Sequence, residues 1–163
     1  MHDDLSRALK NSGLLAINNT AQAAQATLVV VGVARGGTSL LAGVLSKLGV
    51  FMGDESHPPV YEDLCLSRAF ENGDPELPKE LIGDYDQRHK TWGWKRPGSV
   101  DYLERAHGLL RNPRYLVIFK DIFSIANRNR ISMANDVLPG MQRALSDYQK
   151  VVDFLEQKKP TAL

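Results

Sequence analysis

Residues 27–49, TLVVVGVARGGTSLLAGVLSKLG, constrain the fold of this chain more than any other stretch. They begin with an apolar, β-branched run from Leu28 to Val33, which has the length and composition of a strand buried on both faces. They end in an expected helix, and Gly49 stands where a left-handed residue often terminates a helix. The apolar side chains of this helix repeat with a period of 3.6 residues and predict one core-facing side: Leu40, Leu41, Val44, Leu45 and Leu48.

The turn between strand and helix, GVARGGTS, has the composition of a phosphate-binding loop. Its glycines let the backbone bend tightly and point its N–H groups toward one place, and the helix N-terminus adds partial positive charge there. Compared with the nucleotide-triphosphate signature G-x-x-x-x-G-K-[ST], the loop keeps Gly32, Gly37 and Ser39, but Thr38 stands at the lysine position. The nearest cation is Arg35. Because a triphosphate-cleaving enzyme normally needs that lysine, the sequence favours a different phosphate ester.

Strands and helices alternate along the rest of the chain. The apolar run YLVIF at residues 115–119 predicts a second buried strand, WGWK a short strand or extended stretch, and the final TAL the opening of a third strand. Helices are expected over residues 3–11, 60–71, 75–90 with an interruption at Gly83, 100–110, and from Asp121 to about Ala134.

A long helix follows, begun near Asp136 or Pro139 and ended by Pro160. Its expected core face is Leu138, Met141, Leu145, Tyr148, Val152 and Leu155. The alternation implies right-handed crossovers and a parallel sheet covered on both faces. We therefore predict a single α/β domain over residues 1–163. Ligands of such sheets bind beyond the carboxyl ends of the strands, where the glycine loop and Lys120 should meet.

Composition excludes several other classes of protein. With 163 residues and a net charge of +1, the chain suits one domain and has no global attraction to nucleic acid. Its N-terminus lacks a secretory pattern and no apolar run approaches the roughly 18 residues of a membrane span, so we predict a cytoplasmic protein. The lone Cys65 excludes an internal disulfide and a cysteine-based metal cage, and it is expected to be a buried apolar residue.

The loop segment GVARGGTSLL resembles the 5′-phosphosulfate-binding loop of the sulfotransferases, with the pattern G-x-P-[RK]-S-G-T-[ST]-L-L after the first strand. Members of this family bind 3′-phosphoadenosine 5′-phosphosulfate (PAPS). The resemblance implies a P-loop-like fold in which Arg35, Gly36, Gly37, Thr38 and Ser39 bind the phosphosulfate, Arg35 being also a catalytic cation. Glycine replaces the serine of the pattern at Gly36, which removes one hydroxyl contact, and alanine replaces its proline.

The segment RYLVIFKDIFSIANRNR resembles the family's 3′-phosphate-binding segment, an apolar strand that ends in R-D-P and is followed by a serine eight residues after the arginine. Lys120 takes the place of the arginine, Ile122 that of the proline and Arg128 that of the serine. The resemblance implies that Lys120 and Arg128 together hold the 3′-phosphate. In the alternative interpretation Arg128 is simply solvated on a polar helix face.

The segment TWGWKRPGS resembles the W-G-W-K-D-P stretch of many bacterial members, with Arg96 in place of the aspartate. Lys95 then either faces the cofactor or substrate, or merely flanks two packing tryptophans. The segment VYED resembles YFED, in which glycan-type and bacterial members carry a catalytic carboxylate. This implies Glu62 as the general base, with Asp63 second and His57 a lesser candidate; the alternative is a surface carboxylate in the first turn of a helix.

The resemblance covers roughly residues 27–160, whereas family members continue into another strand, further helices and a C-terminal loop. The chain is therefore expected to lack the C-terminal part of the family fold. The implied reaction transfers a sulfuryl group from PAPS to a hydroxyl of a small molecule or glycan, without a metal. Two alternatives remain open: a P-loop nucleotide kinase or NTPase in which Asp121 holds the metal, and a noncatalytic nucleotide-binding or interaction protein with the same fold.

Overall fold

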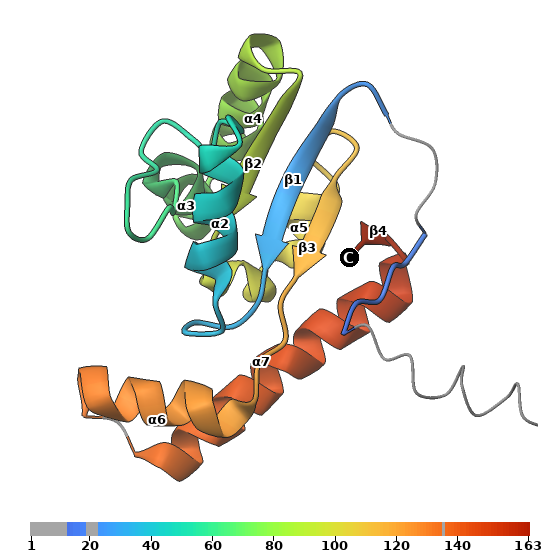
Figure 1. Ribbon diagram of the computed structural model, residues 1–163. Helices are drawn as coiled ribbons and strands as arrows, with labels where there is room; N and C mark the ends of the chain where they lie inside the picture. The colour runs from blue at the N-terminus through green and yellow to red at the C-terminus, as the bar shows by residue number, and fades with distance from the viewer. Residues whose placement is uncertain (1–12, 19–22, 135) are drawn as a thin grey trace, which may run out of the picture.

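A computed structural model describes residues 13–18, 23–134 and 136–163, so the helix expected over residues 3–11 lies outside the described residues. The strands β1 (Ala26–Val31), β2 (Thr91–Lys95), β3 (Arg114–Val117) and β4 (Thr161–Ala162) form one sheet in the order β2-β1-β3-β4. All neighbouring strands are parallel (Figure 1). This confirms the α/β class and the parallel sheet. The final TAL does form a strand, the fourth rather than the third, because WGWK is a strand as well.

The helices follow the predicted order with a few changes of boundary. They are α2 (Thr38–Lys47), α3 (Leu64–Glu71), α4 (Leu77–Arg88), α5 (Leu103–His107), α6 (Ile122–Met133) and α7 (Val137–Lys158). The helix expected from residue 60 begins only at Leu64, because the Asp63 side chain caps it by accepting from the Cys65 amide. The helix expected over 100–110 is divided into a 3-10 turn, η1 (Pro97–Asp101), and α5. Gly83 does not interrupt α4.

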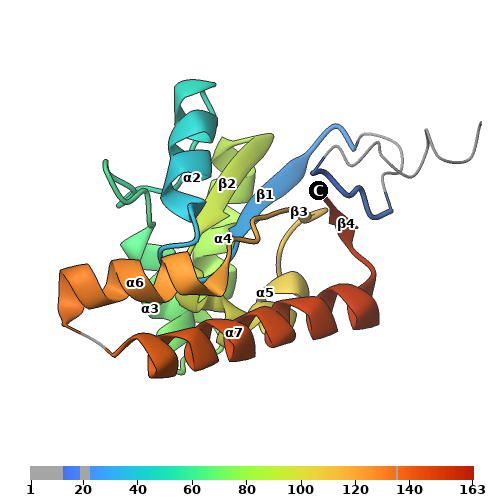
Figure 2. The same cartoon turned by 60° about the horizontal axis from the view of Figure 1, so that its bottom comes forward.

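The two faces of the sheet carry different cores. Val29, Val31, Trp92, Trp94 and Tyr115 belong to the main core, together with side chains of α3, α4, α5 and α7. On the opposite face, Leu28, Val30 and Leu116 pack in a smaller cluster with Ala42 and Leu45 of α2. Figure 2 shows α2 on one side of the sheet and α5 and α7 on the other. The described helices thus cover both faces, as predicted.

The predicted core faces of α2 and α7 are confirmed in part: Leu45 and Tyr148 are buried as expected, but several of the expected leucines are not. In α2 the buried side chains include Ala42 and Leu45, whereas Leu40 and Leu48 are 76% and 75% exposed. In α7 the buried residues are Gly140, Ala144, Tyr148, Val151 and Phe154, and the expected core residues Leu138 and Leu145 are exposed. Small residues such as Ala42, Gly140 and Ala144 allow close packing of the backbone, so they rather than the leucines face the core.

Two further predictions concern the burial of Cys65 and the absence of a membrane-spanning helix. Cys65 is half-buried rather than buried, and burial together with nearby carboxylates raises the pKa of its thiol, which disfavours the thiolate. No helix in the parts of the chain that the structure describes is long and apolar enough to cross a membrane.

Candidate functional site

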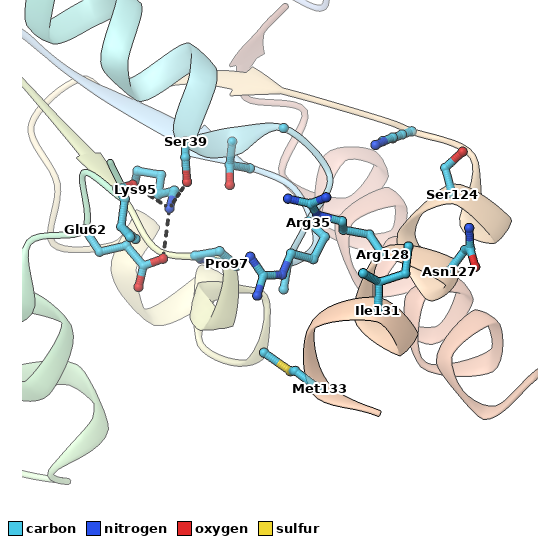
Figure 3. A pocket seen from close by; sticks show the side chains of 15 residues that line it. Arg35, Ser39, Glu62, Lys95, Pro97, Ser124, Asn127, Arg128, Ile131 and Met133 are labelled. Carbon is cyan, nitrogen blue, oxygen red and sulfur yellow. Dashed lines mark hydrogen bonds and ion pairs between the residues drawn. The ribbon is translucent and has the colours of Figure 1, made fainter. Parts of the chain in front are cut away.

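A pocket of about 730 Å³ lies beyond the carboxyl ends of β1, β2 and β3 (Figure 3). In the sheet, β2 lies on one side of β1, and β3 and β4 lie on the other side. The direction of the strand order therefore reverses between β1 and β3. Ligands of open parallel sheets bind at such a point. The pocket is lined by the loop after β1, the loop before α3, the end of β2, the segment after β3, and α6.

The glycine loop bends sharply between β1 and α2. Arg35 and Gly37 both have left-handed backbones, with φ of 66° and 104°. A Cβ on Gly32 would lie 2.9 Å from the Ile118 carbonyl oxygen and 2.9 Å from Thr38 Cγ2, so only glycine lets the loop pass this close to the segment after β3. The Gly36 amide donates to the Val33 carbonyl at 2.9 Å and the residue is buried. Gly36 thus shapes the turn but does not line the pocket.

The start of α2 presents unpartnered amides to the pocket. The first N–H groups of a helix have no intrahelical acceptor. In the parts of the chain that the structure describes, the amides of Gly37, Thr38 and Ser39 donate to no backbone acceptor. Gly37, Thr38 and Ser39 line the pocket together with Arg35. Free amide donors and a helix dipole at this point are features that can attract an anion, and anion binding by the loop stays a prediction.

Lys95 is the most buried charged group of the pocket, with a side chain 1% exposed. Its Nζ donates to Ser39 Oγ at 3.0 Å, to the Val60 carbonyl at 2.9 Å and to Glu62 Oε1 at 2.8 Å (Figure 3). Side chains alternate along β2, so Trp92 and Trp94 enter the main core while Lys95 leaves the opposite face toward α2. Lys95 therefore lines the pocket and does more than flank the two tryptophans, and that it faces a cofactor or substrate stays a prediction.

Glu62 is held between two cations. Its Oε1 accepts from Lys95, and its Oε2 accepts from Arg96 Nη1 at 2.6 Å. Arg96 in turn binds Glu71 through Nε at 2.8 Å and Nη2 at 3.0 Å. Burial by itself would raise the pKa of Glu62, but the hydrogen bonds and charges of Lys95 and Arg96 outweigh it and hold that pKa below its ordinary value. Burial lowers the pKa of Lys95, and Glu62 opposes this effect.

Glu62 precedes α3 and its cap, so the interpretation as a carboxylate in the first turn of a helix does not apply. The two weaker candidates for the base lie elsewhere. Asp63 is fully buried and accepts from Tyr85 Oη at 2.7 Å and from the Glu55 amide at 3.3 Å. Burial raises the pKa of Asp63. His57 is exposed in the preceding loop, and neither residue lines the pocket.

The other end of the pocket is cationic. Lys120 and Arg128 both line it and both are exposed. Arg35 points across the loop and donates to Ser132 Oγ on α6 at 3.4 Å. Among the described residues none of these three cations forms an ion pair. Three cations without carboxylate partners at one pocket leave positive charge available for an anionic ligand.

Some pocket residues were missed by the sequence reasoning. Ser124, Asn127 and Ile131 line the pocket beside Arg128, and all four lie on α6. Residues three and four positions apart lie on one face of a helix, so this spacing relative to Arg128 predicts Ser124 and Ile131 as its neighbours. The Arg96–Glu71 pair had no such signal, because its two members come from distant segments of the chain.

No protein-family model matches the chain, and comparison with curated proteins gives no match. Among the described residues, no group of three His, Cys, Asp or Glu side chains is placed to hold one metal ion.

Proposed function

We propose that the chain is a sulfotransferase with a P-loop-like fold, which binds PAPS in this pocket and transfers its sulfuryl group to an acceptor hydroxyl. One observation carries the proposal. The loop has Thr38 where a nucleotide-triphosphate site has a lysine. Instead, the buried ammonium of Lys95 on β2 lies 3.0 Å from Ser39 Oγ at the start of α2. The proposed compartment is the cytoplasm, which suits a chain with a lone cysteine because disulfides are rare there.

The residues of the pocket suit a nucleotide with two separate anionic groups. The amides of Gly37, Thr38 and Ser39, with Arg35 beside them, would hold the 5′-phosphosulfate. At the α6 end of the pocket, Lys120 and Arg128 would hold the 3′-phosphate. Lys95 at the start of α2, with Arg35, Lys120 and Arg128 toward α6, gives one pocket several cations, and this charge supports a bisphosphate more than a single phosphate.

The bound PAPS would supply an activated sulfuryl group on a phosphate leaving group. The acceptor oxygen forms a bond to sulfur as the bond from sulfur to the phosphate oxygen breaks, and the acceptor proton passes to the Glu62 carboxylate. Lys95 and Arg35 stabilise the charge that builds up on the departing phosphate.

The alternative of a nucleotide kinase or NTPase has less support. It requires Asp121 to hold a metal, but Asp121 Oδ1 accepts from the Ser124 amide at 2.7 Å and caps α6. The proposal is tested by calorimetric titration of the folded chain with 3′,5′-adenosine bisphosphate in metal-free buffer, and with ATP in the presence and absence of magnesium. We expect metal-independent binding of the bisphosphate. Binding of ATP only with magnesium, and no binding of the bisphosphate at millimolar concentration, would reject the proposal.

A noncatalytic nucleotide-binding protein is the second candidate, and one observation favours it. Both carboxylate oxygens of Glu62 are occupied by cations, and a carboxylate with a lowered pKa is a weak base. The two candidates differ in turnover. Transfer of radiolabelled sulfuryl from PAPS to an acceptor alcohol, abolished in Glu62→Gln, would exclude the noncatalytic candidate; bisphosphate binding without any transfer would favour it.

A further inference from the structure

A second hollow, of about 550 Å³, lies along the outer side of α2. We call it the α2 groove. Its walls are mainly apolar and are formed by α2 and by the loop before α3: Leu40, Val44, Leu48, Pro58, Pro59 and Tyr61. Leu40, Val44 and Leu48 are 76%, 46% and 75% exposed. Apolar side chains gathered at one exposed hollow are typical of a binding site rather than of an ordinary surface.

The local fold of α2 and of the loop before α3 forms the two walls of the groove. Leu40, Val44 and Leu48 follow each other at intervals of four residues, so they form one stripe along α2, while Ala42 and Leu45 face the core. Tyr61 has a left-handed backbone with φ of 55°, and its amide donates to the His57 carbonyl at 2.8 Å.

This turn brings the loop back onto α2. A Cβ on Gly43 would lie 3.0 Å from Tyr61 Cε2, so the absence of a side chain at Gly43 lets the tyrosine ring form the wall opposite the stripe.

The α2 groove is continuous with the candidate active site. Ser39 lines both hollows. In the loop, Val60 and Glu62 line the first pocket and Tyr61, between them, lines the groove. A molecule lying in the groove therefore has one end beside Ser39 and close to Glu62, the proposed base. That is the place where an acceptor must present its hydroxyl.

The chemistry of the groove differs from that of the first pocket. Arg35, Lys120 and Arg128 line the first pocket and not the groove, whose one charged lining residue among the described residues is Lys47. A sugar would place many hydroxyls against apolar walls with few hydrogen-bonding partners, which is costly. An aromatic or alicyclic body would instead bury apolar surface there.

We infer that the α2 groove binds the apolar body of the acceptor, so that the acceptor is an aryl or alicyclic alcohol and not a glycan. The inference rests on the proposed function, since it assigns the acceptor of the same reaction. The nucleotide keeps the cationic pocket, and the acceptor occupies the groove with its hydroxyl directed at Ser39 and Glu62.

The test uses 2-naphthol as the probe, with binding to the full chain followed by naphthol fluorescence anisotropy. We expect saturable binding that weakens at least tenfold in Val44→Asp and in Leu48→Asp, because each places a carboxylate in the groove. Ser46→Asp is the matched control: Ser46 is exposed on the same helix and does not line the groove, so naphthol affinity should stay at the parent value. Circular dichroism and the urea midpoint show whether each variant is folded.

The outcomes separate this inference from the proposed function. Bisphosphate binding without naphthol binding, or equal naphthol affinity in folded Val44→Asp, Leu48→Asp and parent proteins, would overturn the groove assignment alone. Naphthol binding that depends on Val44 and Leu48 in a chain that does not bind the bisphosphate would support the groove and reject the reaction. Competition by methyl β-glucoside as strong as by cyclohexanol, or a dimer in sedimentation that Val44→Asp dissociates, would overturn the aryl-alcohol assignment.

Discussion

Lys95 leaves the sheet at the last residue of β2 and reaches Ser39, the second residue of α2, in the next layer. Its three donors are used by a hydroxyl, a carbonyl and a carboxylate, so the buried charge is fully hydrogen-bonded. A buried ammonium persists only with such partners. At the scale of the residue, Lys95 links the sheet, the start of α2 after the glycine loop, and the proposed base Glu62.

Replacing Lys95 by methionine should therefore affect both binding and stability. Loss of a charge-assisted contact worth about 1.5–3 kcal/mol lowers the affinity for 3′,5′-adenosine bisphosphate roughly tenfold to a hundredfold. The free energy of unfolding falls by about 1–3 kcal/mol, because Ser39, Val60 and Glu62 each lose a donor. Calorimetry and urea unfolding measure the two effects, with Lys90→Met at an exposed lysine as the control. Parent-like affinity in folded Lys95→Met would make Lys95 purely structural.

The ion pairs of Glu62 should make the free energy of unfolding depend on pH. Its folded-state pKa lies below the ordinary value of 4.5, so the stability from its ion pairs is complete above pH 4.5 and is lost as the pH falls through the folded-state pKa. The difference in unfolding free energy between the parent and Glu62→Gln should thus be largest near neutral pH and shrink in acid. Urea unfolding across this range measures it, with exposed Glu156→Gln as the control. A difference independent of pH would contradict the ion-paired state of Glu62.

At the scale of the element, α6 depends on α7 for its position. The two helices lie side by side beyond the end of β3 (Figure 1). Val33, Ile125, Ala144 and Tyr148 form a small core between the loop and the helix pair. Tyr148 Oη also accepts from the Lys120 amide at 2.7 Å. The α6–α7 pair therefore fixes the position of Lys120 and of the α6 residues that line the pocket.

A substitution at Gly140 should separate α6 from α7. A Cβ there would lie 3.1 Å from Ala126 Cβ, so the branched side chain of Gly140→Val forces α6 and α7 apart. We expect a loss of about 1–3 kcal/mol in unfolding free energy, together with weaker bisphosphate binding because Arg128 moves with α6. Gly83→Ala is the control: no atom lies within 4 Å of its added Cβ in the interior of α4, so it should stabilise the chain by about 0.5–1 kcal/mol. Equal urea midpoints for Gly140→Val and the parent would contradict the close packing of the pair.

The sequence predicted the existence and order of these elements better than their orientation. β1 and β3 were recognised because a buried parallel strand is a continuous apolar run. The core faces of α2 and α7 are only partly predictable: periodicity finds Leu45 and Tyr148, but it favours leucines where the close helix contacts select Ala42, Gly140 and Ala144. The sequence predicts too early a start for α3, since Asp63 caps the helix by accepting from the Cys65 amide and α3 begins only at Leu64.

At the scale of the whole molecule, the topology explains why several predicted residues line one pocket. Parallel strands bring their carboxyl ends to one edge, so Arg35, Lys95 and Lys120 meet although they are far apart in sequence. The ion pairs of Glu62 with Lys95 and Arg96 were not predictable, because their geometry depends on how the loop before α3 lies against the end of β2. The result is a pocket with the buried Lys95 near the start of α2 and three exposed cations, Arg35, Lys120 and Arg128, toward α6.

The measurement that tests this two-ended pocket most directly compares 3′,5′-adenosine bisphosphate with adenosine 5′-monophosphate by calorimetry, in the parent chain and in the double variant Lys120→Gln/Arg128→Gln. If the 3′-phosphate lies against Lys120 and Arg128, the parent binds the bisphosphate roughly tenfold to a hundredfold more tightly, as expected for a charge-assisted contact of about 1.5–3 kcal/mol. The double variant should lose this preference while its affinity for the monophosphate stays near that of the parent. Equal affinities for the two nucleotides in the parent, or an unchanged preference in the folded double variant, would contradict the account.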